Sequence, residues 1–162
     1  MIDVEAEDEA WAQALPDFEK ITLVAAAAAL DNLPPTEKDF GDTTILLTDD
    51  ETVRNLNARF RGKDAPTNVL SFPAHDTAHG HLGDIALAYG VCAREAAEQG
   101  KTLAAHLQHL VAHGVLHLVG YDHEDDGQAE VMEDLERRIL AGLGLPDPYV
   151  DRQGSPPDHG QR

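Results

Sequence analysis

The sequence predicts a single α+β domain, with a small mixed β-sheet packed against several helices. Helix-like and strand-like segments mix along the chain without strict alternation, which favours this class over a regular α/β fold. The length of 162 residues suits one compact domain with a substantial core. The longest largely aliphatic run is only Ile21 to Leu30, whereas a bilayer-spanning helix needs about 20 apolar residues, so we expect no membrane span.

The N-terminal part of the chain is predicted to hold one buried strand and two helices, after a first segment that has two interpretations. Met1 to Ala10 forms either a short edge strand or a frayed acidic end. Leu15 to Leu30 is rich in Ala and is predicted to form a helix that Pro34 and Pro35 stop. Thr43 to Thr48 is β-branched and aliphatic, which is typical of a buried strand, and polar residues after it cap a helix that extends to about Phe60.

The remaining elements are two strands and three helices. The strands are expected at Asn68 to Phe72 and at Asp84 to Tyr89, with a loop between them that carries His75, His79 and His81. Residues 1–150 are assigned to the one domain, and the Pro, Gly and polar residues of 151–162 to a disordered tail. The helices are expected at Val91 to Gln99, at Leu103 to Val119 after a Thr102 cap and before Gly120, and at Asp125 to Leu143.

Composition limits the partners and the compartment. The net charge of −18 opposes unguided binding to nucleic acid or to anionic membranes. Salt screens charges beyond about 8–10 Å, so a bound phosphate would depend on the local cationic cluster of Arg54, Arg59, Arg61 and Lys63. Arg54 and Arg59 are equally well explained as a solvated helix end. Cys92 is the only cysteine, which excludes an internal disulfide and fits a reducing cytoplasm.

A histidine pattern predicts a metal site on the long helix and the turn after it. His113 and His117 are four residues apart, so their imidazoles lie on one helix face and can point at one ion. Gly120 permits a sharp turn that brings His123 back as a third ligand. Three protein ligands leave the fourth position of zinc open, as in catalytic sites, so we expect one Zn²⁺ per chain, although imidazole also suits Cu and Ni.

Two further histidines precede this pattern on the same helix. His109 lies four residues before His113 and could form a rival pair, but the helix continues there and offers no third ligand after a turn. His106 is seven residues from His113, about 10.5 Å along a helix, and cannot share its ion. We interpret both as residues of the site wall, as supports for the ligands, or as ordinary packing.

The histidine spacing also matches the metzincin zinc peptidases, which makes a metallopeptidase the first alternative. Those enzymes use a Glu directly after the first His as their general base. Gly114 stands at that position and cannot accept a proton. Such proton transfer contributes ~10²–10⁴-fold to the reaction rate. Because Gly114 cannot supply it, we rank a metallopeptidase below a hydrolase of another kind.

Four motifs of the chain, taken together, point to one protein family. The first is His113 to His123, in the pattern HGxLHLxGYDH, and the second is Arg61 to Pro73, RGKDAPTNVLSFP. The third is Leu82 to Ile85, LGDI, and the fourth is the acidic helix that leads to Asp147-Pro148-Tyr149. In these motifs the chain resembles the bacterial YbeY family of rRNA-maturation endoribonucleases, and the resemblance covers about Thr43 to Tyr149.

The resemblance implies a zinc-dependent single-strand endoribonuclease that acts in 16S rRNA 3′-end maturation and ribosome quality control. It implies zinc on the three histidines, and the family's functional arginine falls on Arg61. The implied partners are single-stranded rRNA, the small ribosomal subunit and proteins bound to it. The strong acidity of the chain favours delivery of RNA by a docked partner. The second alternative is a ribosome-assembly binding module whose metal mainly holds the fold.

Overall fold

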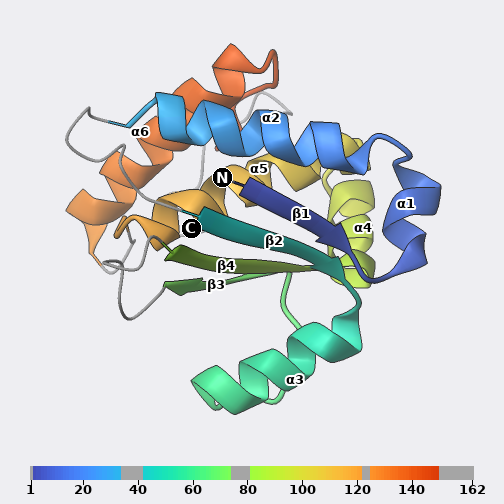
Figure 1. Ribbon diagram of the computed structural model, residues 1–162. Coiled ribbons are helices and arrows are strands. Elements are labelled where there is room, and N and C mark those ends of the chain that lie inside the picture. Colours follow the sequence, from blue (N-terminus) through green and yellow to red (C-terminus); the bar gives the residue numbers. More distant parts are fainter. Residues whose placement is uncertain (1, 34–41, 74–80, 122–124, 150–162) are drawn as a thin grey trace.

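The computed structural model describes residues 2–33, 42–73, 81–121 and 125–149 (Figure 1). One four-stranded sheet has the order β1-β2-β4-β3. β1 is parallel to β2 and β2 to β4, whereas β3 is antiparallel to β4, so the predicted mixed sheet is confirmed. The N-terminal segment forms an edge strand, as one of its two predicted alternatives. The strands are β1 (Ile2–Ala6), β2 (Asp42–Thr48), β3 (Val69–Pro73) and β4 (His81–Ala88).

Helices cover both faces of this sheet. The long helix α5 and its neighbours α2 and α6 lie on one face, and α3 lies on the other (Figure 1). This layered arrangement is the predicted α+β class. The helices are α1 (Glu9–Ala14), α2 (Phe18–Asp31), α3 (Asp50–Arg61), α4 (Tyr89–Glu98), α5 (Leu103–Leu118) and α6 (Asp126–Gly142).

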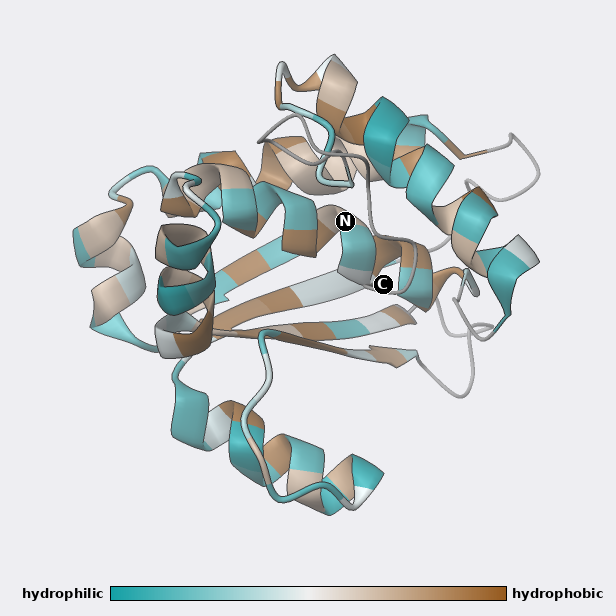
Figure 2. Ribbon diagram, turned by 180° about the vertical axis from the view of Figure 1, so that it is seen from behind, coloured by the Kyte–Doolittle hydropathy of each residue, from teal (hydrophilic) through white to brown (hydrophobic). Residues whose placement is uncertain are grey.

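The alternation of side chains along β2 and β4 explains the two apolar layers. Successive residues of a strand point to opposite faces. Ile45, Leu47 and Ile85 are fully buried in the main core beneath α2 and α5. Leu46 and Ala86 point the other way and pack in the smaller cluster with α3. Hydrophilic residues cover much of the outer surface of α3 and α6 (Figure 2).

The predicted N-terminal helix is confirmed with a later start, and a second, shorter helix that the sequence does not predict precedes it. The helix predicted from Leu15 begins at Phe18, and α1 precedes it. Asp8 caps α1 by accepting a hydrogen bond from the Ala10 N–H at 2.9 Å. Trp11 anchors α1 in the core, where it is 0% exposed and donates its indole N–H to the Thr48 carbonyl at 2.9 Å. Such an anchor depends on tertiary packing and leaves no periodic signal.

The ends of α5 match their prediction. The Thr102 hydroxyl accepts a hydrogen bond from the Ala105 N–H at 3.0 Å, which begins the helix. Gly120 follows the helix with φ of 102°, a conformation that favours glycine. Among the described residues no helix combines the length and apolar character needed to cross a bilayer. The predicted tail, 151–162, and His75, His79 and His123 lie outside the described residues.

Candidate functional site

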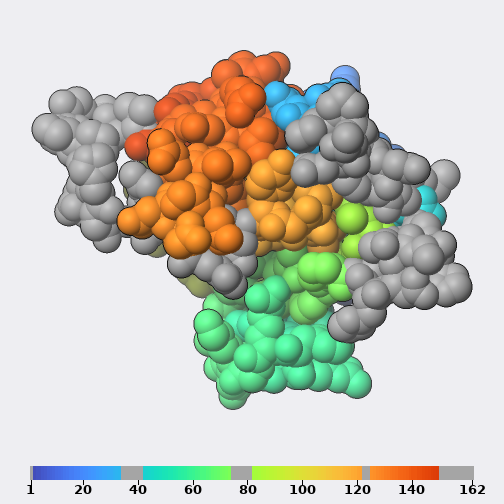
Figure 3. Space-filling model, turned by 90° about the vertical axis from the view of Figure 1, so that its left-hand side faces the viewer, coloured from blue at the N-terminus to red at the C-terminus, as the bar shows by residue number. Residues whose placement is uncertain are grey.

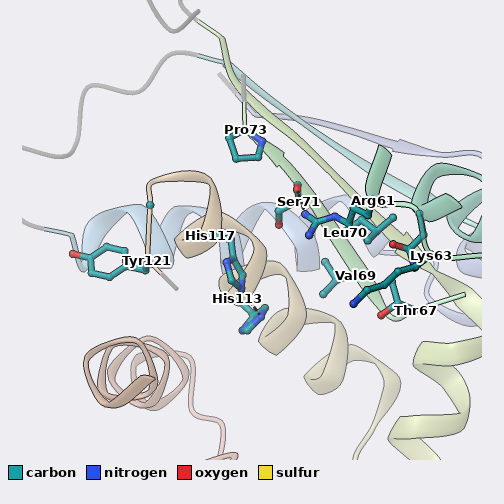
Figure 4. Close-up of a pocket in the computed structure, with 12 residues that line it drawn as sticks. Arg61, Lys63, Thr67, Val69, Leu70, Ser71, Pro73, His113, His117 and Tyr121 are labelled. Carbon is teal, nitrogen blue, oxygen red and sulfur yellow. Dashed lines mark hydrogen bonds between the residues drawn. The ribbon is translucent and has the colours of Figure 1, made fainter. Parts of the chain in front are cut away.

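A cavity of about 500 Å³ opens between α5 and the stretch of chain that joins α3 to β3 (Figure 4). In the space-filling view α3 stands out as a separate lobe below the surface of α5 and α6 (Figure 3). Imidazole groups lie on one side of the cavity and cationic groups on the other. Its lining residues are Asn57, Arg61, Lys63, Thr67, Val69, Leu70, Ser71, Pro73, His113, His117, Gly120 and Tyr121.

The structure brings two of the predicted ligands together in this cavity. The Nε2 atoms of His113 and His117 are 3.1 Å apart. Two imidazole nitrogens that share one tetrahedral zinc ion, each at about 2.0–2.1 Å, would be separated by about 3.3 Å. The observed separation therefore fits a shared ion with little movement of either ring.

The third predicted ligand, His123, lies outside the described residues. Within the parts of the chain that the structure describes, no three His, Cys, Asp or Glu side chains group closely enough to hold a metal ion. Of the three ligands that the sequence predicts, the structure therefore describes the two on α5, and both line the open cavity.

A buried carboxylate lies behind the two histidines, and sequence reasoning missed it. Glu136 of α6 is 1% exposed. Its Oε1 is 2.8 Å from His109 Nε2 and 3.3 Å from His113 Nδ1, and its Oε2 accepts a hydrogen bond from Tyr149 at 2.8 Å. Burial raises the pKa of Glu136, but hydrogen bonds from His109 and His113 outweigh it and lower the pKa to about 2.

A signal for Glu136 is present in the sequence of α6. The residues of this helix that pack into the core recur at the spacing of one helical face, at Met132, Leu135 and Ile139. Glu136 occupies a position within that apolar face. A carboxylate at such a position is rarely buried without a partner, which makes it a candidate for contact with a functional group.

The two earlier histidines of α5 have separate partners. His109 contacts the same carboxylate as His113, so it belongs to the surroundings of the site. His106 is buried, and its Nε2 lies 2.8 Å from Oε1 of Glu95 in α4. Burial lowers the pKa of His106, against the opposing effect of Glu95. This pair links α4 to α5 and does not line the cavity of His113 and His117.

Arg61 reaches the cavity from the last turn of α3. Gly62 follows it with φ of 71° and ends the helix. The Arg61 guanidinium donates to the Ser71 carbonyl at 2.7 Å, and the Ser71 hydroxyl donates to the Gly114 carbonyl at 3.2 Å. These two bonds connect the cationic end of α3 to the histidine helix through β3. Asp64, three residues after Arg61, accepts a hydrogen bond from Arg54 at 2.7 Å.

Gly114 has a packing role that its position after His113 did not reveal. A Cβ atom there would lie 3.1 Å from two carbons of Ile85 and 3.2 Å from the Ser71 hydroxyl. These distances are tight for one carbon, so Ile85 or Ser71 would have to shift by a few tenths of an ångström. The Cβ of a metzincin's general-base Glu would meet the same crowding at this position.

We expect Gly114→Ala to lower the free energy of unfolding by about 1–2 kcal/mol. Overpacking costs about 1–3 kcal/mol, and the better helix propensity of Ala returns up to about 1 kcal/mol. Gly142→Ala in α6 is the control, because a Cβ there meets nothing within 4 Å and the change should stabilise the chain. Urea unfolding measures both variants. Equal stabilisation by both would contradict the close approach at Gly114.

The comparisons with known proteins agree over nearly the whole chain. The family described as Endoribonuclease YbeY matches residues 4–144. Endoribonuclease YbeY of Maricaulis maris is 49% identical over 160 residues, covering 99% of this chain and 98% of its own. Endoribonuclease YbeY of Azorhizobium caulinodans is 51% identical over 153 residues, covering 92% and 96%.

A solved structure agrees in fold. The solution structure of a Thermotoga maritima protein superposes with a TM-score of 0.56 at 22% identity, over 96% of this chain and 100% of that one. At this identity the likeness concerns the fold alone. The family match extends over the residues on both sides of the cavity, and the two relatives are about 50% identical to this chain. These findings establish the family. The chain belongs to the YbeY family.

Proposed function

We propose that this chain is a metal-dependent endoribonuclease that cuts single-stranded rRNA in 16S 3′-end maturation and ribosome quality control. One observation carries the proposal: a single cavity is lined by the imidazoles of His113 and His117 and by the cations Arg61 and Lys63. The family supports the choice of RNA as the substrate. Metal and cation together suit a phosphodiester, because its negative charge needs stabilisation during cleavage.

The proposed cofactor is one Zn²⁺ held by His113, His117 and His123. The 3.1 Å separation of the two α5 nitrogens supports a shared ion, and the third donor rests on the sequence spacing. When bound, a zinc ion supplies Lewis acidity and makes hydrolysis feasible at neutral pH. The described residues hold no carboxylate in the cavity lining, so the general base of a peptidase has no counterpart among them.

Arg61 is the proposed catalytic residue of the chain, and its task is to hold the scissile phosphate. A guanidinium has five N–H donors in a fixed fork and can give two parallel hydrogen bonds to phosphate oxygens. One of these donors is used by the Ser71 carbonyl, which fixes the side chain beside the cavity. Lys63 on the same rim adds a second positive charge.

The overall negative charge of the protein is compatible with RNA binding only if a partner helps to deliver the RNA. The net charge is −18, and the Arg54 charge is offset by Asp64. A docked partner on the small ribosomal subunit can hold the RNA while the local cations of the cavity act within the screening length of about 8–10 Å. We therefore propose the cytoplasmic ribosome precursor as the place of action.

Incubation of the purified chain with a single-stranded fragment of the 16S 3′ region tests the function. We expect cleavage that a chelator abolishes and that added zinc restores. A product with a 5′-phosphate indicates attack by water, and a 2′,3′-cyclic phosphate indicates attack by the RNA hydroxyl. Cleavage that persists after complete metal removal would refute the metal-dependent mechanism.

Metal affinity is expected to fall as the pH drops from 8 to 5. Imidazole must be neutral to bind a metal, and free histidine takes up its proton at a pH of about 6.5. Protons compete with the metal below that value, so metal affinity must decrease as the pH falls. Zinc affinity measured at several pH values checks this expectation. An affinity that stays constant over this range would mean that histidines are not the ligands.

A further inference from the structure

The Glu136 carboxylate joins three groups from two parts of the chain, the helix α5 and the segment after α6. It contacts His109 and His113 of α5 through Oε1, at 2.8 and 3.3 Å, and Tyr149 through Oε2, at 2.8 Å. A carboxylate ion only accepts hydrogen bonds, so each partner is the donor. His113 accordingly carries its proton on Nδ1. Its Nε2 then presents a lone pair towards Nε2 of His117, on the side of the cavity.

The segment after α6 holds Glu136 from its other side. The Tyr149 N–H donates to Asp147 at 2.8 Å, and the Tyr149 hydroxyl binds Glu136. Arg137 donates to Asp147 with a separation of 3.1 Å, and its guanidinium lies 5.4 Å from the centre of the Tyr149 ring. The motif Asp147-Pro148-Tyr149, for which the sequence offered no chemical role, thus clamps the second oxygen of the carboxylate.

We propose that Glu136 is a positioning residue of the metal site, which fixes the tautomer and the ring orientation of His113 and so raises the affinity for the metal. The inference rests on the proposed metal site of His113 and His117. A carboxylate behind a ligating histidine makes the imidazole a better donor, and loss of such a partner costs about 10–100-fold in metal affinity. Tyr149 keeps the carboxylate in place, and His109 shares the same oxygen.

The variant Glu136→Gln tests this role. Glutamine keeps the shape of the side chain but removes the negative charge of the carboxylate. Its NH₂ group also replaces one of the two acceptor oxygens and therefore faces a donor of His109, His113 or Tyr149. We expect the affinity for Zn²⁺, measured by competition with a chelator, to fall about 10–100-fold. NMR of the imidazole nitrogens of the metal-free protein provides a second measurement. It should show the Nδ1–H form of His113 in the wild type and a mixture of tautomers in the variant.

Glu95→Gln is the matched control. Glu95 makes the same kind of contact, at 2.8 Å, with His106 of the same helix, away from the proposed ligands. It should lower the melting temperature while leaving zinc affinity and the His113 tautomer unchanged. Wild-type zinc affinity in Glu136→Gln, or an equal loss in Glu95→Gln, would overturn the proposal. If the wild-type chain binds no zinc, the proposed metal site itself is wrong, and an unchanged His113 tautomer in Glu136→Gln would then refute the role of Glu136 separately.

Discussion

Replacement of His117 by Ala is expected to remove both bound zinc and RNA cleavage. The variant breaks the pair of imidazoles whose Nε2 atoms lie 3.1 Å apart, and two remaining ligands hold zinc poorly. A metal supplies several kcal/mol of transition-state stabilisation, so the rate should fall about 10³-fold or more. Zinc content by elemental analysis and cleavage of a single-stranded 16S fragment measure the two effects on the same preparation.

His106→Asn separates metal binding from the stability of α5. His106 lies on the same helix, but it contacts Glu95 and does not line the cavity. We expect a lower melting temperature with zinc and cleavage retained. Full zinc occupancy in a His113→Ala, His117→Ala double variant would rule out this metal site.

The same measurements decide between an enzyme and a binding module with a structural metal. If the metal mainly holds the fold, His117→Ala should lower the melting temperature as severely as it lowers activity. The packing of α5 predicts that stability is retained, because Leu107, Val111 and Leu116 are fully buried and hold the helix in place without a metal. We therefore expect a folded His117→Ala protein that is inactive.

Parts of the site that lie on one helix could be predicted from the sequence. Spacing by four residues puts His113 and His117 on one face whatever the rest of the fold does. The cap at Thr102 and the positive φ of Gly120 are equally local, and both match. Whether these histidines bind metal stays a prediction, because His123 lies outside the described residues.

Contacts between distant elements could not be predicted in the same way. Glu136 and His113 are 23 residues apart, and Ser71 and Gly114 are 43 residues apart. Which residue of α6 faces α5 depends on how the two helices pack on the sheet, and no local spacing encodes that. Gly114 illustrates the limit: the sequence indicates only that a general base is absent there, whereas the structure adds that its carbonyl and its lack of a side chain serve contact with β3.

Replacement of Arg61 by Ala is expected to lower RNA cleavage about 10²–10³-fold, the usual cost of losing one donor that stabilises developing charge. Arg61 ends α3, lines the cavity of the histidines and is exposed, so its loss should leave zinc content unchanged. The single hydrogen bond to the Ser71 carbonyl contributes about 1 kcal/mol, which limits the expected fall in stability.

Arg61→Lys distinguishes bidentate binding from simple positive charge. Lysine keeps the charge but loses the planar fork, and it cannot hold the Ser71 carbonyl and a phosphate in the same geometry. We expect it to recover little of the lost cleavage. Recovery close to the wild-type rate would mean that Arg61 acts only through its charge.

Arg59→Ala is the control for the charge of α3. Arg59 lies in the same helical turn and is exposed, but its guanidinium lies 5.6 Å from the centre of the Phe60 ring and it does not line the cavity. Its loss should hardly change cleavage. Equal losses in Arg59→Ala and Arg61→Ala would indicate a diffuse electrostatic effect on RNA binding.

Normal cleavage in Arg61→Ala would remove Arg61 from the site, and lost cleavage with a collapsed melting temperature would assign it to structure. The link from Arg61 through Ser71 to Gly114 favours a positioned phosphate contact, because it fixes this one cation relative to the histidine helix.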